Sequence, residues 1–377
     1  MKKLRLKLFL IELAVIFLII SPVLLKADDI KVKIENGIQV IYNPKKPAPP
    51  KGSLAKIVLK HEFSIGEGKF DEGRFGELTS MDVDNDGNIY VLDGKEKTIK
   101  VFDSAGKFVK KFGEEGQGPG ELNLPVSLQV TPAREIVIGD ASNQKLMFFS
   151  YDGKFLREMS TAIKARGLVL PLFDSQGNII GQQIVQAEGK IIREVRKYDR
   201  ELNSLFTLAS VDITGVIQGK IDPFRMVFSY QFGKDNSIYC GDLDKYEIKV
   251  FSPEGKLIKK ILKDYDPVKL TEKDKEEFFG RMPEIGPQAK ERIKFSEVFP
   301  PYQNFTMDEK WRLFVRTFEK GKDKGEYYLD VFDEEGKYIA KFSFKVEPRA
   351  WRENKLYAME EDDSGFQTLK IYSVRWQ

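Results

Sequence analysis

Short apolar runs and polar turn clusters alternate along most of this chain. Residues 89–93 (IYVLD) and 99–103 (IKVFD) are two such runs, and the cluster DNDGN at 84–88 precedes the first of them. Short runs with a two-residue alternation, separated by Asp, Asn and Gly, are typical of antiparallel strands joined by hairpins. The pattern therefore predicts an all-β protein.

The strand unit repeats six times along the chain. Each copy carries an aromatic residue near the end of its third run, and these markers are Phe102, Phe149, Tyr198, Phe251, Phe332 and Tyr372. Most neighbouring markers are 40 to 53 residues apart, a period typical of a four-stranded propeller blade. One interval is 81 residues long, which predicts a helical insertion at 264–303 between blades 4 and 5, with helices near 270–279 and 288–295.

The two ends of the chain predict how the ring closes. The sixth copy ends before a fourth strand, whereas residues 55–66 resemble the fourth strand of the first copy at 108–113. The N-terminal segment is therefore expected to act as a clasp strand, which removes an exposed sheet edge. The predicted fold is a six-bladed β-propeller of four-stranded antiparallel blades.

The N-terminus has the pattern of an export signal. Basic residues precede an apolar run at 8–25, and Ala27 offers a small residue for cleavage. The run is also nearly long enough for an uncleaved membrane anchor, so both alternatives stay open. The expected location is periplasmic or secreted, with membrane attachment only through residues 8–25.

These segments divide the chain into three parts. Residues 1–27 form the signal peptide or anchor, residues 28–52 a leader strand with a Pro-rich spacer, and residues 53–377 the propeller. The chain has a net charge of +3, of which residues 1–27 contribute +4, so the remainder has a net charge of −1. A nearly neutral domain lacks the basic face that a nucleic-acid partner requires.

The repeats resemble NHL repeats. The stretch 89–93, the stretch 99–103 and residues 106–113 (GKFVKKFG) follow that family's pattern closely, while the third, fifth and sixth copies depart from it. The whole chain is similar to exported bacterial six-bladed propeller proteins whose function is uncharacterised. This resemblance implies the fold but no activity, because function on a propeller belongs to its loops.

One column of residues is the predicted ligand-binding site. The ends of the six second strands carry Asp93, Asp140, Gln183, Asp242, Thr317 and Glu360. Equivalent positions in successive blades converge around the axis on one face, beside loops 66–78, 113–125, 207–226 and 264–303. The predicted function is therefore non-catalytic binding of a protein or small ligand at this mouth. The alternative is that each residue only caps its own turn.

A second prediction is a calcium-dependent hydrolase or lyase. It would hold a channel ion through four carboxylates of the same column, namely Asp93, Asp140, Asp242 and Glu360. The residues Asp82, Asp84, Asp86 and Asp93 also fit a calcium-loop expression, but no helices flank them. The preferred prediction is that the protein holds no cofactor, and calcium is the alternative.

The chain has too few histidines and cysteines for the other kinds of catalysis known on propellers to be expected. Some NHL-like propellers are zinc-dependent lyases that use several histidines, but His61 is the only histidine in this chain. His61 lies in the predicted clasp strand and is interpreted as a packing or surface residue. The single cysteine, Cys240, lies in an apolar strand and is interpreted as a buried side chain rather than a reactive thiol. The chain is therefore expected not to be an enzyme.

Overall fold

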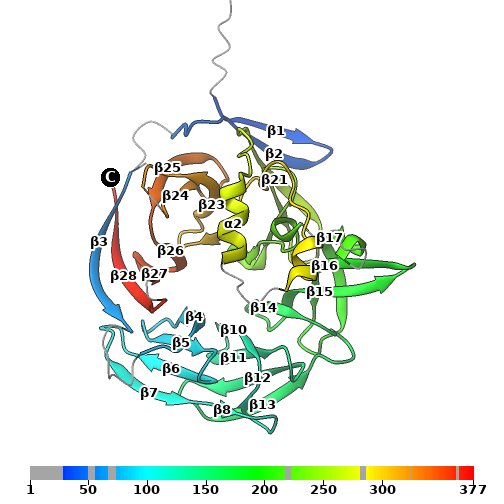
Figure 1. Ribbon diagram of the computed structural model, residues 1–377. Helices are drawn as coiled ribbons and strands as arrows, with labels where there is room; N and C mark the ends of the chain where they lie inside the picture. Colours follow the sequence, from blue (N-terminus) through cyan, green and yellow to red (C-terminus); the bar gives the residue numbers. More distant parts are fainter. Residues whose placement is uncertain are drawn as a thin grey trace, which may run out of the picture.

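The computed structural model describes residues 29–49, 56–66, 74–216, 222–280, 286–323, 325–361 and 365–377. The predicted export segment at 1–27 lies outside these residues. Within them the chain forms six four-stranded antiparallel blades arranged in a ring (Figure 1), and the predicted all-β six-bladed propeller is confirmed.

The first three blades follow one another along the chain. Blade 1 consists of β4 (Leu78–Val83), β5 (Ile89–Asp93), β6 (Thr98–Phe102) and β7 (Phe108–Phe112). Blade 2 consists of β10 (Pro125–Val130), β11 (Glu135–Asp140), β12 (Lys145–Ser150) and β13 (Phe155–Ser160). Blade 3 consists of β14 (Val169–Phe173), β15 (Ile179–Ala187), β16 (Lys190–Tyr198) and β17 (Ser204–Asp212). The short strands β8 (Glu114–Glu115) and β9 (Glu121–Leu122) pair between blades 1 and 2.

The other three blades complete the ring. Blade 4 consists of β18 (Tyr230–Phe232), β19 (Ile238–Gly241), β20 (Glu247–Phe251) and β21 (Leu257–Lys263). Blade 5 consists of β22 (Asn304–Met307), β23 (Leu313–Lys320), β24 (Tyr327–Phe332) and β25 (Tyr338–Phe344). Blade 6 consists of β26 (Glu347–Arg352), β27 (Lys355–Glu361), β28 (Gln367–Trp376) and β3 (Ile57–Ile65). In Figure 1, β3 runs beside β28, so the fourth strand of blade 6 comes from a part of the chain that precedes blade 1.

The core is divided among the junctions between blades. Between blades 6 and 1, for example, Val83 and Phe102 pack against Tyr357 and Ile371, and all four side chains are buried. The described residues contain six such clusters, one at each junction. Because strands inside a blade are buried on both faces, β5 reads as a continuous apolar run rather than as a strict alternation.

The leader adds two strands to blade 4. Strands β1 (Lys31–Glu35) and β2 (Ile38–Asn43) form a hairpin, and β2 pairs parallel to β21, so this blade becomes a six-stranded sheet. The leader strand predicted near residue 30 is therefore part of a hairpin on the outer rim of the ring (Figure 1). Strands β2 and β21 are more than two hundred residues apart in the sequence, so no local pattern predicts their parallel pairing.

The predicted insertion carries two helices, α2 (Glu272–Gly280) and α3 (Pro287–Glu291). Helix α2 begins as predicted after Thr271, whose hydroxyl accepts a hydrogen bond from the Asp274 N–H at 3.3 Å, while the Asp274 carboxylate accepts one from the Thr271 N–H at 2.8 Å. Figure 1 shows α2 near the centre of the ring. None of the helices in the described part of the chain has the length and apolar character needed to cross a membrane.

Candidate functional site

The strand register places the predicted column at one end of the central channel. Asp93 at the end of β5 lies opposite Leu78 at the start of β4, whereas Ile89 lies opposite Val83 at the other end. The column therefore lies at the end that carries the connections between blades, including α2.

Asp93 is bound by its own blade. Its carboxylate is fully buried and accepts hydrogen bonds from the Gly76 N–H at 2.8 Å and the Glu96 N–H at 3.0 Å, and the Lys100 ammonium lies 3.1 Å away. Burial alone would raise the pKa of Asp93, but these backbone hydrogen bonds and Lys100 hold it below its ordinary value. The side chain caps the turn between β5 and β6, and Lys100 compensates its charge.

Other members of the column show the same local bonding. Asp140 accepts hydrogen bonds from the backbone of Asn123 at 2.6 Å and of Asn143 at 2.8 Å. Asp242 lies 3.4 Å from the Lys249 ammonium, and Glu360 lies 2.5 Å from that of Lys370. The Thr317 hydroxyl donates to the Tyr328 carbonyl at 3.0 Å, and Gln183 is buried. Ligand binding by this column stays a prediction.

The hairpin of β4 and β5 separates the residues that fit the calcium-loop expression. Asp82 pairs with Tyr90 near one end of blade 1, whereas Asp93 lies at the other end. Asp84 accepts hydrogen bonds from the Asp86 N–H at 2.9 Å and the Asn88 N–H at 2.8 Å, so it caps the turn between β4 and β5. Among the described residues, no three His, Cys, Asp or Glu side chains are grouped so that they could hold a metal ion.

A cavity that the sequence did not indicate lies at the opposite end of the channel. Its volume is about 430 Å³, and it is lined by the first strands of all six blades, by the first turns of blades 1, 2 and 5, and by Tyr151 of blade 2. The polar and aromatic members of its wall include Asp82, Gln129, Tyr151, Gln231, Thr306, Asp308, Glu309, Trp311, Arg349, Trp351 and Arg352. No member of the predicted column is among the residues that line it.

Two of the lining side chains hold neighbouring blades together. The Asp82 carboxylate accepts a hydrogen bond from the Val130 N–H at 2.9 Å, and the Gln129 amide oxygen accepts one from the Phe173 N–H at 2.9 Å. The inner edge of a blade has no further strand to pair with, so these side chains satisfy backbone groups that would otherwise be unpaired. Burial raises the pKa of Asp82, and the hydrogen bonds to Val130 and Val83 only partly offset this.

The acidic side chains at the first turn of blade 5 differ in how far the fold uses them. Asp308 accepts hydrogen bonds from the Arg312 N–H at 2.9 Å and forms an ion pair with the Arg312 guanidinium at 2.6 Å. Glu309 accepts a hydrogen bond from the Asn354 N–H at 3.1 Å. The Asp308 carboxylate is thus an acceptor for the fold itself, whereas Glu309 is exposed and accepts one hydrogen bond among the described residues.

The two arginines of the cavity use only some of their N–H donors in contacts with the described residues. Arg352 donates one long hydrogen bond, 3.3 Å, to the Val83 carbonyl. Arg349 lies 3.5 Å from the Glu347 carboxylate and donates a hydrogen bond to the Met359 sulfur at 3.1 Å, while its buried Nε has no partner among the described residues. A guanidinium carries five N–H donors, so each of these two side chains can donate further hydrogen bonds. The wall therefore suits a ligand rich in oxygen acceptors, and a carboxylate matches the guanidinium fork best.

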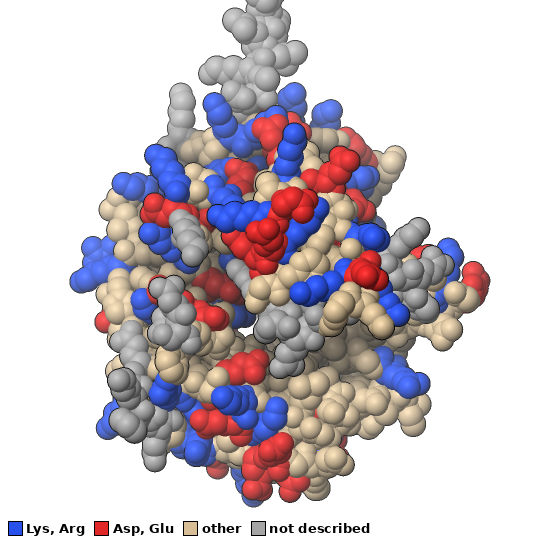
Figure 2. All heavy atoms as spheres, viewed as in Figure 1, with Lys and Arg blue, Asp and Glu red and all other residues tan. Residues whose placement is uncertain are grey.

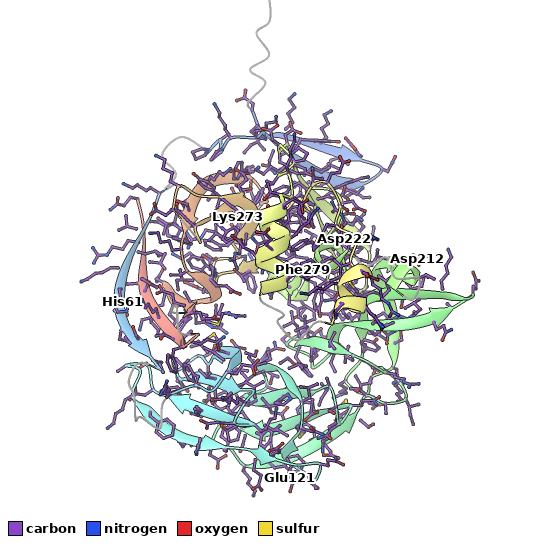
Figure 3. All side chains as sticks on the ribbon, in the orientation of Figure 1. His61, Glu121, Asp212, Asp222, Lys273 and Phe279 are labelled. Atoms are coloured by element: carbon purple, nitrogen blue, oxygen red, sulfur yellow. The ribbon has the colours of Figure 1, made fainter. Side chains whose placement is uncertain are left out.

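An aromatic cluster fixes the insertion to the other face. Phe224 makes edge-to-face contacts with Phe278 of α2 at 5.5 Å and with Phe299 at 5.0 Å, and Phe299 stacks on Phe318 at 4.3 Å. Lys320 of blade 5 forms an ion pair with Asp274 of α2. Figure 3 shows Phe279 and Lys273 on this helix, near the ring centre.

The single histidine and cysteine lie away from the channel cavity. His61 is on β3 at the outer rim (Figure 3), where its ring contacts Tyr372 with centroids 5.5 Å apart. Cys240 is 1% exposed, and burial raises the pKa of its thiol to about 12.

Over the face shown in Figure 2, acidic and basic side chains are interspersed. This mixed surface fits the nearly neutral charge of the propeller.

Comparison with known proteins supports the fold. Residues 71–178 match the DUF5128 family, described as 6-bladed beta-propeller. The chain is 27% identical over 136 residues to Protein brain tumor of Drosophila melanogaster, covering 35% of this chain and 13% of that protein. It is 44% identical over 52 residues to the E3 ubiquitin-protein ligase TRIM32 of Mus musculus, covering 14% of this chain and 8% of that protein. The chain thus spans only a small part of these two relatives.

A solved structure is similar over nearly the whole ring. A Bacteroides fragilis protein that is named as an exported protein matches with a TM-score of 0.56 and 12% identity, covering 90% of this chain and 99% of that one. At this identity the likeness shows the fold alone. Together these matches and the six blades confirm the resemblance to NHL-repeat propellers.

Proposed function

We propose that this six-bladed propeller, with repeats similar to NHL repeats, is an exported, non-catalytic binding protein. It holds the carboxylate of a ligand in the central channel, in the cavity at the end opposite α2. The ligand is a small carboxylic acid or a carboxylate that projects from a protein partner.

One observation carries this proposal. The cavity is built by the first strands of all six blades; Asp82 and Asp308 are used by the fold, while Arg352 donates one long hydrogen bond among the described residues. A preformed concavity with a few convergent polar groups is the usual form of a ligand site. Two of the chain's three tryptophans, Trp311 and Trp351, line the same wall beside Arg349 and Arg352.

Two observations support export. The N-terminal sequence combines basic residues with an apolar run at 8–25, and the Bacteroides fragilis protein of similar fold is named as an exported one.

Intrinsic tryptophan fluorescence tests the binding proposal directly. Citrate, glutamate and galacturonate are titrated as carboxylate probes, with glutamine and galactose as uncharged counterparts. At least one carboxylate is expected to change the emission in a saturable way, while its uncharged counterpart does not. For a carboxylate on a protein partner, the probe is a peptide with a free C-terminus. The amidated form of the same peptide is its uncharged counterpart.

The arginine variants locate the site. Arg352→Gln is expected to weaken carboxylate binding at least about tenfold, because a charge-assisted hydrogen bond contributes roughly 1.5–3 kcal/mol. Arg166→Gln is the matched control, since Arg166 is exposed in the connection between blades 2 and 3 and lies outside the cavity. If no carboxylate probe binds, or if Arg352→Gln binds as well as the wild type, the proposal fails.

A further inference from the structure

Strand β1 is an exposed sheet edge on the outer rim of the ring. It is the last strand of the blade 4 sheet, with β2 on one side and no described strand on the other. All five of its residues are exposed, and two are apolar: Val32 is 46% exposed and Ile34 is 70% exposed. A row of unpaired backbone groups flanked by exposed apolar side chains is a template for another strand.

The turn of the hairpin determines which backbone groups are unpaired. Asn36 and Gly37 form a two-residue turn, with φ of 52° and 79°, and Glu35 pairs with Ile38 across it. In such a hairpin the pair that flanks the turn exchanges both hydrogen bonds, and hydrogen-bonded pairs then alternate along the ladder. The N–H and C=O groups of Val32 and Ile34 therefore point away from β2, toward the open edge.

We infer that β1 pairs antiparallel with β1 of a second copy of this chain, across a two-fold axis at Lys33. In this register Val32 of one copy lies opposite Ile34 of the other and exchanges both hydrogen bonds with it. Lys31 of each copy then lies opposite Glu35 of the other, which gives two cross-strand ion pairs. Opposite charges and apolar pairs at such positions stabilise a sheet.

Charge disfavours one neighbouring register, and the hairpin turn disfavours the other. A shift of two residues in one direction places Lys31 opposite Lys33, which repels. The same shift in the other direction places Val32 opposite Asn36, which lies in the turn and is not extended. The inferred register leaves one like-charge contact, between the two copies of Lys33. In the single chain the Lys33 ammonium lies 5.4 Å from the centroid of the Tyr42 ring.

Glu35 has capacity for the second ion pair. One of its carboxylate oxygens accepts a hydrogen bond from the Tyr42 hydroxyl at 2.7 Å, and the other has no partner among the described side chains. Lysines on an edge strand commonly prevent such pairing, but here the same strand carries the complementary Glu35. A contact of one strand with another buries little surface, so the dimer is weak and concentration-dependent.

Sedimentation of the purified chain over a wide concentration range tests the inference. The wild type is expected to shift from monomer to dimer as its concentration rises. Glu35→Lys replaces two attractive contacts with two repulsive ones and is expected to weaken the dimer about tenfold or more. Lys33→Thr removes the repulsion at the axis and is expected to strengthen it several-fold. Glu201→Lys makes the same charge change at an exposed turn of blade 3 and should leave the association unchanged.

A cysteine pair tests the register itself. Lys33 lies opposite its own copy in a pair that is not hydrogen-bonded, where the Cα atoms are about 4.5 Å apart, within the range that a disulfide spans. Lys33→Cys is therefore expected to form a disulfide-linked dimer under mild oxidation, and Lys31→Cys is not. The native Cys240 is buried and does not interfere. A wild type that stays monomeric at all concentrations, or a dimer unaffected by Glu35→Lys, would overturn the inference.

Discussion

Asp93→Asn separates a structural role of the predicted column from a ligand-binding role. Asp93 is fully buried, accepts backbone hydrogen bonds from Gly76 and Glu96, and lies 3.1 Å from Lys100, which is itself 1% exposed. The asparagine has nearly the same shape but no charge. The substitution therefore leaves the Lys100 ammonium buried beside a neutral amide.

The expected cost follows from this uncompensated charge. Removing one partner of a buried ion pair costs about 3–5 kcal/mol. The lower end applies, since Glu96 lies 3.0 Å from the Lys100 ammonium and is 42% exposed. We therefore expect Asp93→Asn to lower the free energy of unfolding by about 3 kcal/mol. Adding Lys100→Met should recover part of this loss, because the double variant buries no unpaired charge.

Urea unfolding followed by circular dichroism measures the loss, and the carboxylate titration of the channel is repeated on the same variant. Asp86→Asn is the control, because Asp86 and its partner Arg134 are 63% and 69% exposed, and such a pair contributes about 0–1 kcal/mol. The reasoning would be refuted by an Asp93→Asn protein of unchanged stability that has lost ligand binding. That result would place the site at the column.

Three further outcomes are expected. Cys240 should react with Ellman's reagent only as fast as the protein opens, because burial raises its thiol pKa to about 12; prompt reaction of the folded protein would contradict this. The pKa values of Asp93 and Asp242 are lowered on folding, so their stabilisation is present above the unfolded pKa and lost as the pH falls through the folded values. Unfolding free energy should therefore decline below about pH 4, and less steeply in Asp242→Asn; identical acid profiles for the two proteins would argue against this. A chelator should leave the melting temperature unchanged, whereas a large decrease would support calcium at the predicted carboxylates.

The blade pattern could be predicted because each blade repeats local chemistry. Phe102 and Phe149 lie near the ends of third strands, as their spacing indicates, and an Asp-capped turn such as the one at Asp84 recurs between strands. Hairpins connect neighbouring strands in the sequence, so their register is encoded locally. This is why the number and order of the strands followed from one chain.

The channel cavity could not be predicted in the same way. Asp82 and Gln129 appear in the sequence as ordinary polar residues of alternating strands, and their contact with the next blade emerges only when the ring closes. The column at Asp93 was visible in the sequence as a repeated position. Its partner Lys100 follows seven residues later, and this spacing was the available signal that Asp93 belongs to a structural ion pair.

The pairing of β3 with β28 has a consequence for the order of folding. Ser373 and Lys60 make a hydrogen bond across 313 residues of sequence, so the last blade cannot form until the final residues are available. Contacts over such separations form late, because the entropy of closing the loop must be paid first. If the chain crosses a membrane unfolded and N-terminus first, β3 therefore reaches the far side early and stays unpaired until β28 has crossed. Ring closure would then mark the completion of transport, and a truncation that removed β28 would leave β3 without its partner strand.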